Sequence, residues 1–250
     1  MRTVGLMIVK NELDRYLERS LTGLAAVVDK VVVVDDHSTD GSLEFVSSHP
    51  SEPMCVRRPS EVPSFVSDER TFRQWAWSQA VLHEDDVIFV VDADEQLAAE
   101  QSAEPEAVRA MVNTTAETVT RGKAAFLPII EIWAVTPPLS VAPGRLQHRT
   151  DGEWGRGRAQ RVATAFGDQS FGEGAKGRFG CGAIPERARS LRPHQAPLRL
   201  VHYGYATQSD REARHDRYRK ARGHSPSHIE SIMALPRLAV FDAPGLWELR

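Results

Sequence analysis

Three short apolar runs mark the first hundred residues, and each is followed by polar or acidic residues. The runs cover 4–9, 31–34 and 87–91. Uninterrupted runs of this length are typical of strands buried on both faces of a parallel sheet. Between the first two runs, leucines recur at helical spacing from Leu13 to Leu24. A strand that leads into an amphipathic helix and then into a second buried strand predicts a βαβ unit, and hence an α/β sheet.

The rest of the chain continues this alternation. We expect a helix within 98–121, strands over 124–134 and 198–205, and a highly charged helix over 209–223. Acids are interspersed with arginines in the last of these, so we interpret that helix as a solvated face. The whole pattern predicts an α/β protein with a doubly wound, mostly parallel sheet flanked by helices, and with a C-terminal helical extension.

Glycine and arginine are concentrated in the segment 152–182. Such a segment is either a mobile loop near phosphates or a solvated insertion, and the sequence leaves both open. We expect residues 1–205 to form one domain with halves at 1–97 and 98–205, followed by the helical extension at 206–250.

Composition excludes some functions and partners. The net charge of −3, with 26% charged residues, gives no case for nucleic acid or a membrane surface as a partner. Cys55 and Cys181 are far apart and show no metal-ligand spacing, which suits a reducing compartment. The first apolar run stops at Lys10, too early for a signal peptide, and no run is long enough to span a bilayer. We therefore expect a cytoplasmic protein without a transmembrane segment; its oligomeric state stays open.

Carboxylates gather where the apolar runs end. Asp92, Asp94 and Glu95 follow the third run, Asp36 follows the second, and His202 follows a later one. In open α/β sheets, ligands bind at the carboxyl ends of the strands. Residues two apart on an extended chain point the same way, so Asp92 and Asp94 can face one cation. Oxygen ligands favour Mg²⁺ or Mn²⁺, which usually complete their shell with substrate phosphates, so the pattern indicates a phosphate-bearing substrate.

The motifs, taken in order, resemble a family-2 glycosyltransferase with the GT-A fold. The resemblance rests on the strand at 4–9 followed by Lys-Asn-Glu, on V-V-V-V-D-D-x-S-x-D-G-S at 31–42, on an arginine-bearing helix, and on I-F-V-V-D-A-D-E at 88–95. Two shorter matches are G-A-I-P-E-R at 182–187 and H-Y-G-Y at 202–205. No G-x-G-x-x-G or G-x-x-x-x-G-K follows the first strand, which argues against a dinucleotide-binding domain and a P-loop NTPase.

The resemblance implies metal-dependent transfer of a sugar from a nucleotide-diphosphate donor to an acceptor hydroxyl. It assigns 1–97 to the nucleotide sugar and 98–205 to the acceptor, which is a carbohydrate, a lipid-linked molecule or a protein. The implied cofactor is Mn²⁺ or Mg²⁺, bound at a DXD motif by Asp94, with His202 as the second ligand. The implied donor-binding residues are Val9, Asn11, Glu12, Asp36, Arg73, Asp92 and Ala93.

The implied catalytic residues are Asp94 and a carboxylate base. An inverting enzyme needs such a base to take the acceptor's proton on the face opposite the leaving group. Glu186 is the first candidate, although Pro185 stands where the family usually has histidine. Glu131 and Glu173 are the alternatives, and a retaining enzyme would need none of the three.

Two other functions stay open. A nucleotidyltransferase acting on a sugar phosphate also places carboxylates and Mg²⁺ on an α/β sheet, but the Gly-rich phosphate loop expected after its first strand is absent. The other alternative is a non-catalytic binding module that has kept the fold.

Overall fold

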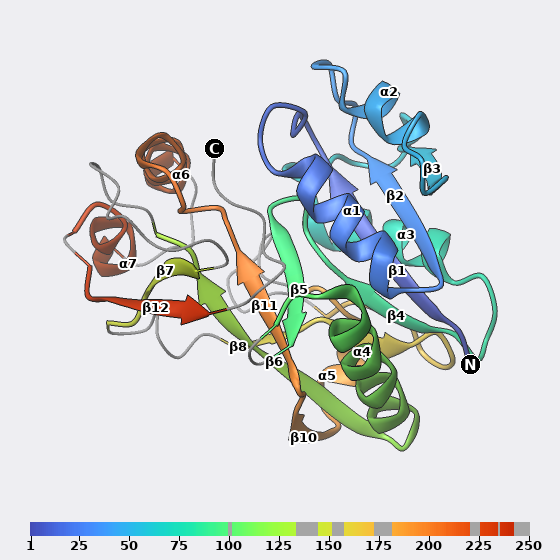
Figure 1. The fold of residues 1–250 in the computed structure, drawn as a ribbon. Helices are drawn as coiled ribbons and strands as arrows, with labels where there is room; N and C mark the ends of the chain where they lie inside the picture. The colour runs from blue at the N-terminus through green and yellow to red at the C-terminus, as the bar shows by residue number, and fades with distance from the viewer. Residues whose placement is uncertain are drawn as a thin grey trace.

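A sheet of mostly parallel strands forms the N-terminal half of the molecule (Figure 1). The computed structural model describes residues 1–99, 102–133, 145–151, 158–172, 182–220, 226–234 and 236–242. The sheet has the order β3-β2-β1-β4-β9, in which only β9 is antiparallel to its neighbour. Its strands are β1 (Thr3–Val9), β2 (Lys30–Asp35), β3 (Met54–Arg57), β4 (Val87–Val90) and β9 (Val162–Thr164).

Helices cover both faces of this sheet, as doubly wound topology requires. Alternate residues of each strand belong to different core clusters. One cluster packs against α1 (Leu17–Val27) and α4 (Pro105–Thr120), and the other against α3 (Glu69–Ala80). The close approach of α1 to β1 depends on Gly5, since a Cβ at that position would lie 2.8 Å from the Leu24 side chain. The predicted doubly wound sheet is therefore confirmed.

The first helix begins later than the leucine spacing suggests. Asn11 takes a positive φ of 55°, and the helix starts only at Leu17. The cause is that the loop after β1 is tied to the loop after β2. The Asn11 backbone N–H donates to Ser38 Oγ (3.0 Å), and Asn11 Oδ1 accepts from the Thr39 backbone N–H (2.8 Å). Asn11 therefore holds the two loops together.

A second sheet has the order β10-β6-β11-β5, and β8 pairs antiparallel with β6. Its strands are β5 (Glu95–Ala99), β6 (Lys123–Glu131), β8 (Arg158–Gln160), β10 (Arg192–Gln195) and β11 (Leu198–His202). Residues 98 and 99 were expected to start a helix, but they end a strand because Ala98 and Ala99 pair with Arg199 and Leu198 of β11. The described part of the Gly/Arg-rich segment forms β8 and β9 and so belongs to both sheets.

The C-terminal elements lie beside the second sheet (Figure 1). They are α6 (Gln208–Lys220), α7 (Pro226–Ser231) and β12 (Leu238–Asp242), which pairs antiparallel with β7 (Arg145–Arg149). Two short helices complete the described elements, α2 (Ser42–Ser47) and α5 (Glu186–Arg189). None of the described helices combines the length and the apolar character that a bilayer span needs.

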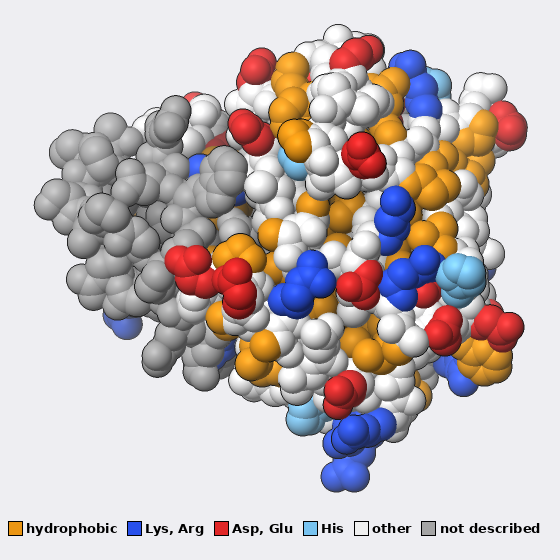
Figure 2. All heavy atoms as spheres, turned by 45° about the vertical axis from the view of Figure 1, so that its right-hand side comes forward, with side chains coloured by type: hydrophobic (Ala, Val, Ile, Leu, Met, Phe, Trp, Pro, Cys, Tyr) orange, Lys and Arg blue, Asp and Glu red, His pale blue; other side chains and the backbone are white. Residues whose placement is uncertain are grey.

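Acidic and basic side chains are interspersed over the face drawn in Figure 2. This mixture agrees with the net charge of −3. In β3, Cys55 is a free thiol whose pKa is raised by burial. Cys181 lies outside the described residues.

Candidate functional site

The candidate site lies at the edge where β1, β2 and β4 end. The register Val9↔Asp35 and Leu6↔Val90 brings their carboxyl ends to the same edge of the sheet. Asp92 and Asp94 follow β4 in a turn, and Glu95 starts β5. The next strand, β11, runs antiparallel to β5 with His202 opposite Glu95, so its last residue also reaches this edge.

Asp94, His202 and Glu131 form a hydrogen-bonded row. His202 Nδ1 lies 2.5 Å from Glu131 Oε2, and His202 Nε2 lies 3.3 Å from Asp94 Oδ2. Pairing of β6 with β11 places Glu131 opposite His202. The Tyr203 backbone N–H donates to the Asp94 carbonyl at 2.8 Å, which fixes the turn against β11. The structure thus brings together the two residues expected to bind a metal.

Arg214 of α6 completes this group. Its Nη2 donates to Asp94 Oδ2 at 2.8 Å, and its Nη1 lies 3.4 Å from His202 Nε2. The side chains of Asp94, His202 and Arg214 are each only 12% exposed. The group of Asp94, Glu131, His202 and Arg214 is called the Asp94 cluster below.

Charge within the Asp94 cluster shifts its titration. Burial alone would raise the pKa of Asp94, but the positive charges of His202 and Arg214 hold it well below its usual range. Burial alone would lower the pKa of His202, but the charges of Glu131 and Asp94 raise it well above its usual value. Without another cation at the site, the two neighbouring carboxylates therefore favour the imidazolium form of His202.

The donor atoms of the Asp94 cluster suit a divalent cation, with one complication. Asp94 Oδ2 and His202 Nε2 converge in front of Gly204, where a Cβ would lie 2.6 Å from each of them. A carboxylate oxygen and an imidazole nitrogen are both ligands of Mn²⁺. No three His, Cys, Asp or Glu side chains form a metal-holding group among the described residues, so the remaining ligands would be substrate phosphates and water. The complication is that the Arg214 guanidinium already faces the same two atoms.

Asp92 contacts a different arginine. Arg161, between β8 and β9, places its Nη2 3.3 Å from Asp92 Oδ2 and 2.6 Å from Glu95 Oε1. Glu95 is buried, and its Oε2 accepts from the Asp92 backbone N–H at 2.9 Å. In this conformation Asp92 therefore pairs with Arg161, and Asp94 pairs with Arg214. Glu95 is a second, buried counter-ion of Arg161. Ala93 is buried between Asp92 and Asp94.

The loop after β1 carries Glu12, whose carboxylate interacts electrostatically with Asp94. The Glu12 backbone N–H donates to Ser42 Oγ at 2.9 Å, and its carboxylate pairs with Arg15 at 2.9 Å. Burial raises the pKa of Glu12 to about 7; the charge of Asp94 adds to this rise, whereas that of Arg15 opposes it. Val9 is buried and accepts from the Asp36 backbone N–H at 2.9 Å.

Asp36 is enclosed by protein. It is fully buried, with Arg58 Nε on one carboxylate oxygen and the Phe65 backbone N–H at 3.2 Å from the other. The Lys10 ammonium contacts its backbone carbonyl. In this conformation Asp36 holds together the loops around the end of β2. A bound ligand would contact its carboxylate only if these loops opened.

Arg73 lies on the other face of the sheet, in α3. Its Nε donates to Glu69 Oε1 at 2.7 Å, and its guanidinium stacks 4.9 Å from the Phe65 ring centre. Its Nη1 is buried without a hydrogen-bond partner in the described structure. Arg73 is thus joined to Asp36 through Phe65, whereas no contact joins it to the Asp94 cluster among the described residues.

The structure separates Glu186 from the Asp94 cluster. Glu186 is the exposed first residue of α5, and its neighbours Pro185 and Arg187 line a hollow together with Met1 and Asp85. Met1 precedes β1 and Asp85 precedes β4, whereas Asp94 follows β4. The helix α5 therefore lies toward the amino ends of these strands (Figure 1). Of the alternative bases, Glu131 is bound to His202, and Glu173 lies outside the described residues.

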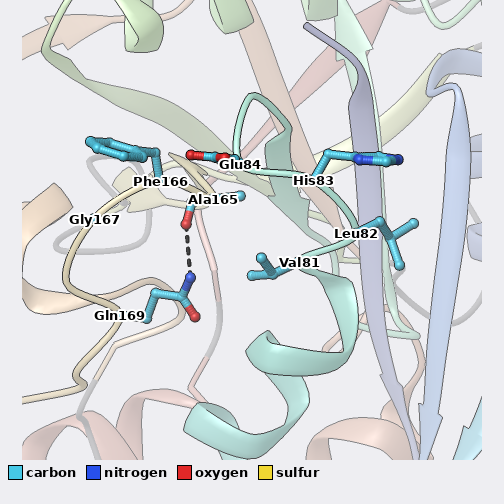
Figure 3. A pocket seen from close by; sticks show the side chains of 8 residues that line it. All are labelled: Val81, Leu82, His83, Glu84, Ala165, Phe166, Gly167 and Gln169. Atoms are coloured by element: carbon cyan, nitrogen blue, oxygen red, sulfur yellow. Dashed lines mark hydrogen bonds between the residues drawn. The ribbon is translucent and has the colours of Figure 1, made fainter.

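Two hollows at the opposite edge of the sheet do not include the site residues. One, of about 470 Å³, is lined by Val81 to Glu84 and by residues of the 165–169 loop. Figure 3 shows this loop held by a 2.8 Å hydrogen bond from Gln169 to the Ala165 carbonyl. The other, of about 460 Å³, adjoins it at Phe166. Both hollows lie at the amino end of β4. Ligands of open α/β sheets bind at the carboxyl ends of the strands, so the candidate site lies at the other end of β4.

Sequence reasoning missed Arg161 and Arg214. Arg161 lies within the segment 152–182, for which the sequence predicts a loop or an insertion. Arg214 belongs to the charged helix that was interpreted as a solvated face; that interpretation is wrong on one side of α6, where Arg211 is also buried. The available signal was the i, i+4 spacing of Asp210 and Arg214, which places both on one face of the helix.

The comparisons with known proteins agree with the sequence motifs. Residues 6–118 match the family described as Glycosyl transferase family 2. Comparison with the curated proteins gives no match.

Several solved structures share limited similarity with the chain. The complex of S. aureus TarS 1–349 with UDP-GlcNAc is 21% identical over 58% of this chain and 38% of that chain, with a TM-score of 0.37. TarS 1–349 alone is 14% identical over 94% and 70%, with a TM-score of 0.45. A nucleotidyl transferase from Methanothermobacter thermautotroptrophicus is 15% identical over 88% and 98%, with a TM-score of 0.40. At these scores none of them assigns a function. The family match alone supports an assignment: residues 6–118, just under half of the chain and including Asp36, Asp92 and Asp94, match glycosyl transferase family 2.

Proposed function

We propose that this chain transfers a sugar from a nucleotide-diphosphate donor to an acceptor hydroxyl, with Mn²⁺ or Mg²⁺ bound by Asp94 and His202. The family match supports the class of reaction. The observation that carries the metal assignment is the convergence of Asp94 Oδ2 and His202 Nε2, 3.3 Å apart, at the carboxyl edge of the sheet. When bound, the cation would neutralise the nucleoside diphosphate as it leaves.

Residues of the chain prepare this site in three ways. Glu131 holds Nδ1 of His202, so that with a metal ion bound the imidazole, then neutral, would present its Nε2 lone pair to that ion beside Asp94. Arg161 fixes Asp92 beside Glu95. Arg15 and Arg214 supply positive charge near Asp94 and so add to the attraction for a diphosphate.

The nucleoside would bind along the loops after β1 and β2. Asn11, Glu12 and Asp36 organise these loops, with Asn11 joined to Ser38 and Thr39 of the second loop. Arg73 supports the same region from α3 through Phe65. These residues shape the donor site mainly by holding backbone in place.

Inversion at the anomeric carbon is the stereochemical part of the proposal, and it rests on the family resemblance. An inverting reaction needs a base on the acceptor side. Glu186 would fill that role only if α5 moved toward the Asp94 cluster. Nuclear magnetic resonance of the product's anomeric proton tests inversion, and full transfer by Glu186→Gln would remove Glu186 from the mechanism.

The decisive assay incubates the protein with a panel of nucleotide sugars, with and without Mn²⁺, and identifies the released product. A nucleoside diphosphate whose release needs the cation supports glycosyl transfer, whereas pyrophosphate from a nucleoside triphosphate and a sugar phosphate would indicate a nucleotidyltransferase. Asp94→Asn should reduce turnover at least about a hundredfold, since electrostatic stabilisation of the leaving group is lost. Asp168→Asn, an exposed acid at the opposite edge, is the matched control. Full activity of Asp94→Asn would contradict the proposal.

A further inference from the structure

The α6 helix delivers a positive charge to the carboxylate expected to bind a metal. Arg214 Nη2 lies 2.8 Å from Asp94 Oδ2, the same oxygen that faces His202 Nε2 at 3.3 Å. The guanidinium also stacks 4.6 Å from the Tyr205 ring centre. Arg214 is thus held both by the Asp94 carboxylate and by the Tyr205 ring.

Contacts one turn earlier in α6 fix the position of Arg214. Asp210 accepts from the Tyr16 hydroxyl at 2.8 Å and from Arg15 Nη2 at 3.0 Å. It also accepts from the Thr207 backbone N–H at 3.2 Å, which caps the helix. These bonds tie the first turn of α6 to the segment after β1. Arg214, at i+4 from Asp210, therefore points to Asp94 and His202 as a consequence of how α6 is docked.

A divalent cation and the Arg214 guanidinium need the same space. A cation shared by Asp94 and His202 must lie on the Oδ2 side of Asp94, because His202 Nε2 faces that oxygen. Arg214 Nη1 and Nη2 lie 3.4 Å and 2.8 Å from these two ligand atoms. Gly204 confines the space further, since even a Cβ there would lie 2.3 Å from Arg214 Nη2. Two positive groups so close would repel each other in a partly buried site.

We propose that Arg214 is an internal counter-cation of Asp94 that competes with the divalent metal ion for this carboxylate. Metal binding displaces the guanidinium from Asp94, while its stacking on Tyr205 keeps it beside the site. This inference rests on the proposed metal site at Asp94 and His202, and it deepens that proposal by naming the residue that sets the metal affinity.

Competition between Arg214 and the metal ion couples metal binding to the binding of the nucleotide-sugar donor. The free protein binds a divalent cation weakly, because the cation must first break the Arg214–Asp94 ion pair. A diphosphate brings negative charge that both the cation and the displaced guanidinium neutralise. Donor and metal therefore bind with positive coupling, and each strengthens the binding of the other.

The test measures Mn²⁺ binding to the full chain without any donor, by electron paramagnetic resonance of free Mn²⁺. Arg214→Gln removes the charge but keeps a long polar side chain, and it should bind Mn²⁺ at least roughly tenfold more tightly than the unaltered protein. Arg214→Lys keeps the positive charge, so its binding of Mn²⁺ should remain as weak as that of the unaltered protein. Arg219→Gln, an exposed position on the same helix, is the matched control and should not change the affinity.

A second substitution shows where the more tightly bound Mn²⁺ lies. Asp94→Asn in the Arg214→Gln background should abolish it, which shows that the metal binds at Asp94. Circular dichroism and the thermal midpoint establish that each variant is folded, and Arg214→Met replaces Arg214→Gln if the latter does not fold.

Two results would overturn the inference. One is unchanged or weaker Mn²⁺ binding by folded Arg214→Gln and Arg214→Met, and the other is tighter binding that survives Asp94→Asn. Sugar transfer by the unaltered protein is assayed separately. If transfer needs Mn²⁺ while Arg214 does not affect its binding, the competition fails and the proposed function stands.

Discussion

His202 Nδ1 and Glu131 Oε2 lie 2.5 Å apart, and the register of β6 and β11 sets the two residues opposite each other. A carboxylate on one imidazole nitrogen fixes the ring and makes the other nitrogen a better ligand. The pair is therefore positioned by strand pairing, which is more rigid than a loop.

Removal of the Glu131 carboxylate should weaken the metal site without removing a ligand. We expect Glu131→Ala to lower the Mn²⁺ affinity by about 10- to 100-fold, because His202 loses its orientation and basicity. Glu131→Gln keeps an acceptor oxygen but not the charge, so its loss should be smaller. Titration with Mn²⁺ in the Arg214→Gln background measures both effects. Equal affinities in all three proteins would show that Glu131 does not position His202.

Gly204 should tolerate no side chain, because the Asp94 cluster closes over it. A Cβ at 204 would lie 2.6 Å from Asp94 Oδ2 and from His202 Nε2, so Gly204→Ala must push the two ligands apart. We expect metal-dependent transfer to fall at least about tenfold, since small displacements of catalytic groups have large effects. In the control Gly23→Ala, the new Cβ would lie 3.3 Å from the Gln96 side chain, a much milder overlap than at Gly204. Transfer by Gly204→Ala at the level of Gly23→Ala would contradict the described geometry.

The acids of this edge can be predicted from sequence, and the arginines that bind them cannot. Asp92 and Asp94 follow a buried apolar run, and parallel strands bring such ends to one edge. Arg161 is hidden from this reasoning because its neighbouring strand, Val162–Thr164, is too short to show a period. Arg214 pairs with a residue 120 positions away, and only the docking of α6 decides that contact.

Glu12 should make the stability of the protein depend on pH. Burial raises the pKa of Glu12 in the folded protein to about 7 from its ordinary value of 4.5, with the charge of Arg15 opposing the rise. A raised carboxyl pKa stabilises the fold fully below pH 4.5, and this contribution is lost as the pH rises through 7. Glu12 remains 19% exposed, so we expect a loss on the order of 1–3 kcal/mol.

Urea unfolding of the unaltered protein and of Glu12→Gln at pH 5 and pH 8 measures this contribution. The free energy of unfolding should fall more steeply with pH in the unaltered protein than in Glu12→Gln. Parallel pH dependences would show that the Glu12 carboxyl is not desolvated in the folded state.

Arg161 should stabilise the protein chiefly through Glu95. The Glu95 side chain is 4% exposed and receives a 2.6 Å bond from Arg161 Nη2, so Arg161→Met leaves a buried carboxylate without its partner. Burial raises the pKa of Glu95 to about 7, so the carboxyl is charged at pH 8, and there we expect the free energy of unfolding to fall by roughly 3 kcal/mol. Arg161→Met combined with Glu95→Gln should recover part of this loss, because an amide needs no counter-ion. Arg158→Met, at an exposed position in the preceding strand, should change stability little. Urea unfolding of the four proteins decides the point, and a loss in Arg161→Met no larger than in Arg158→Met would show that Glu95 does not depend on this ion pair.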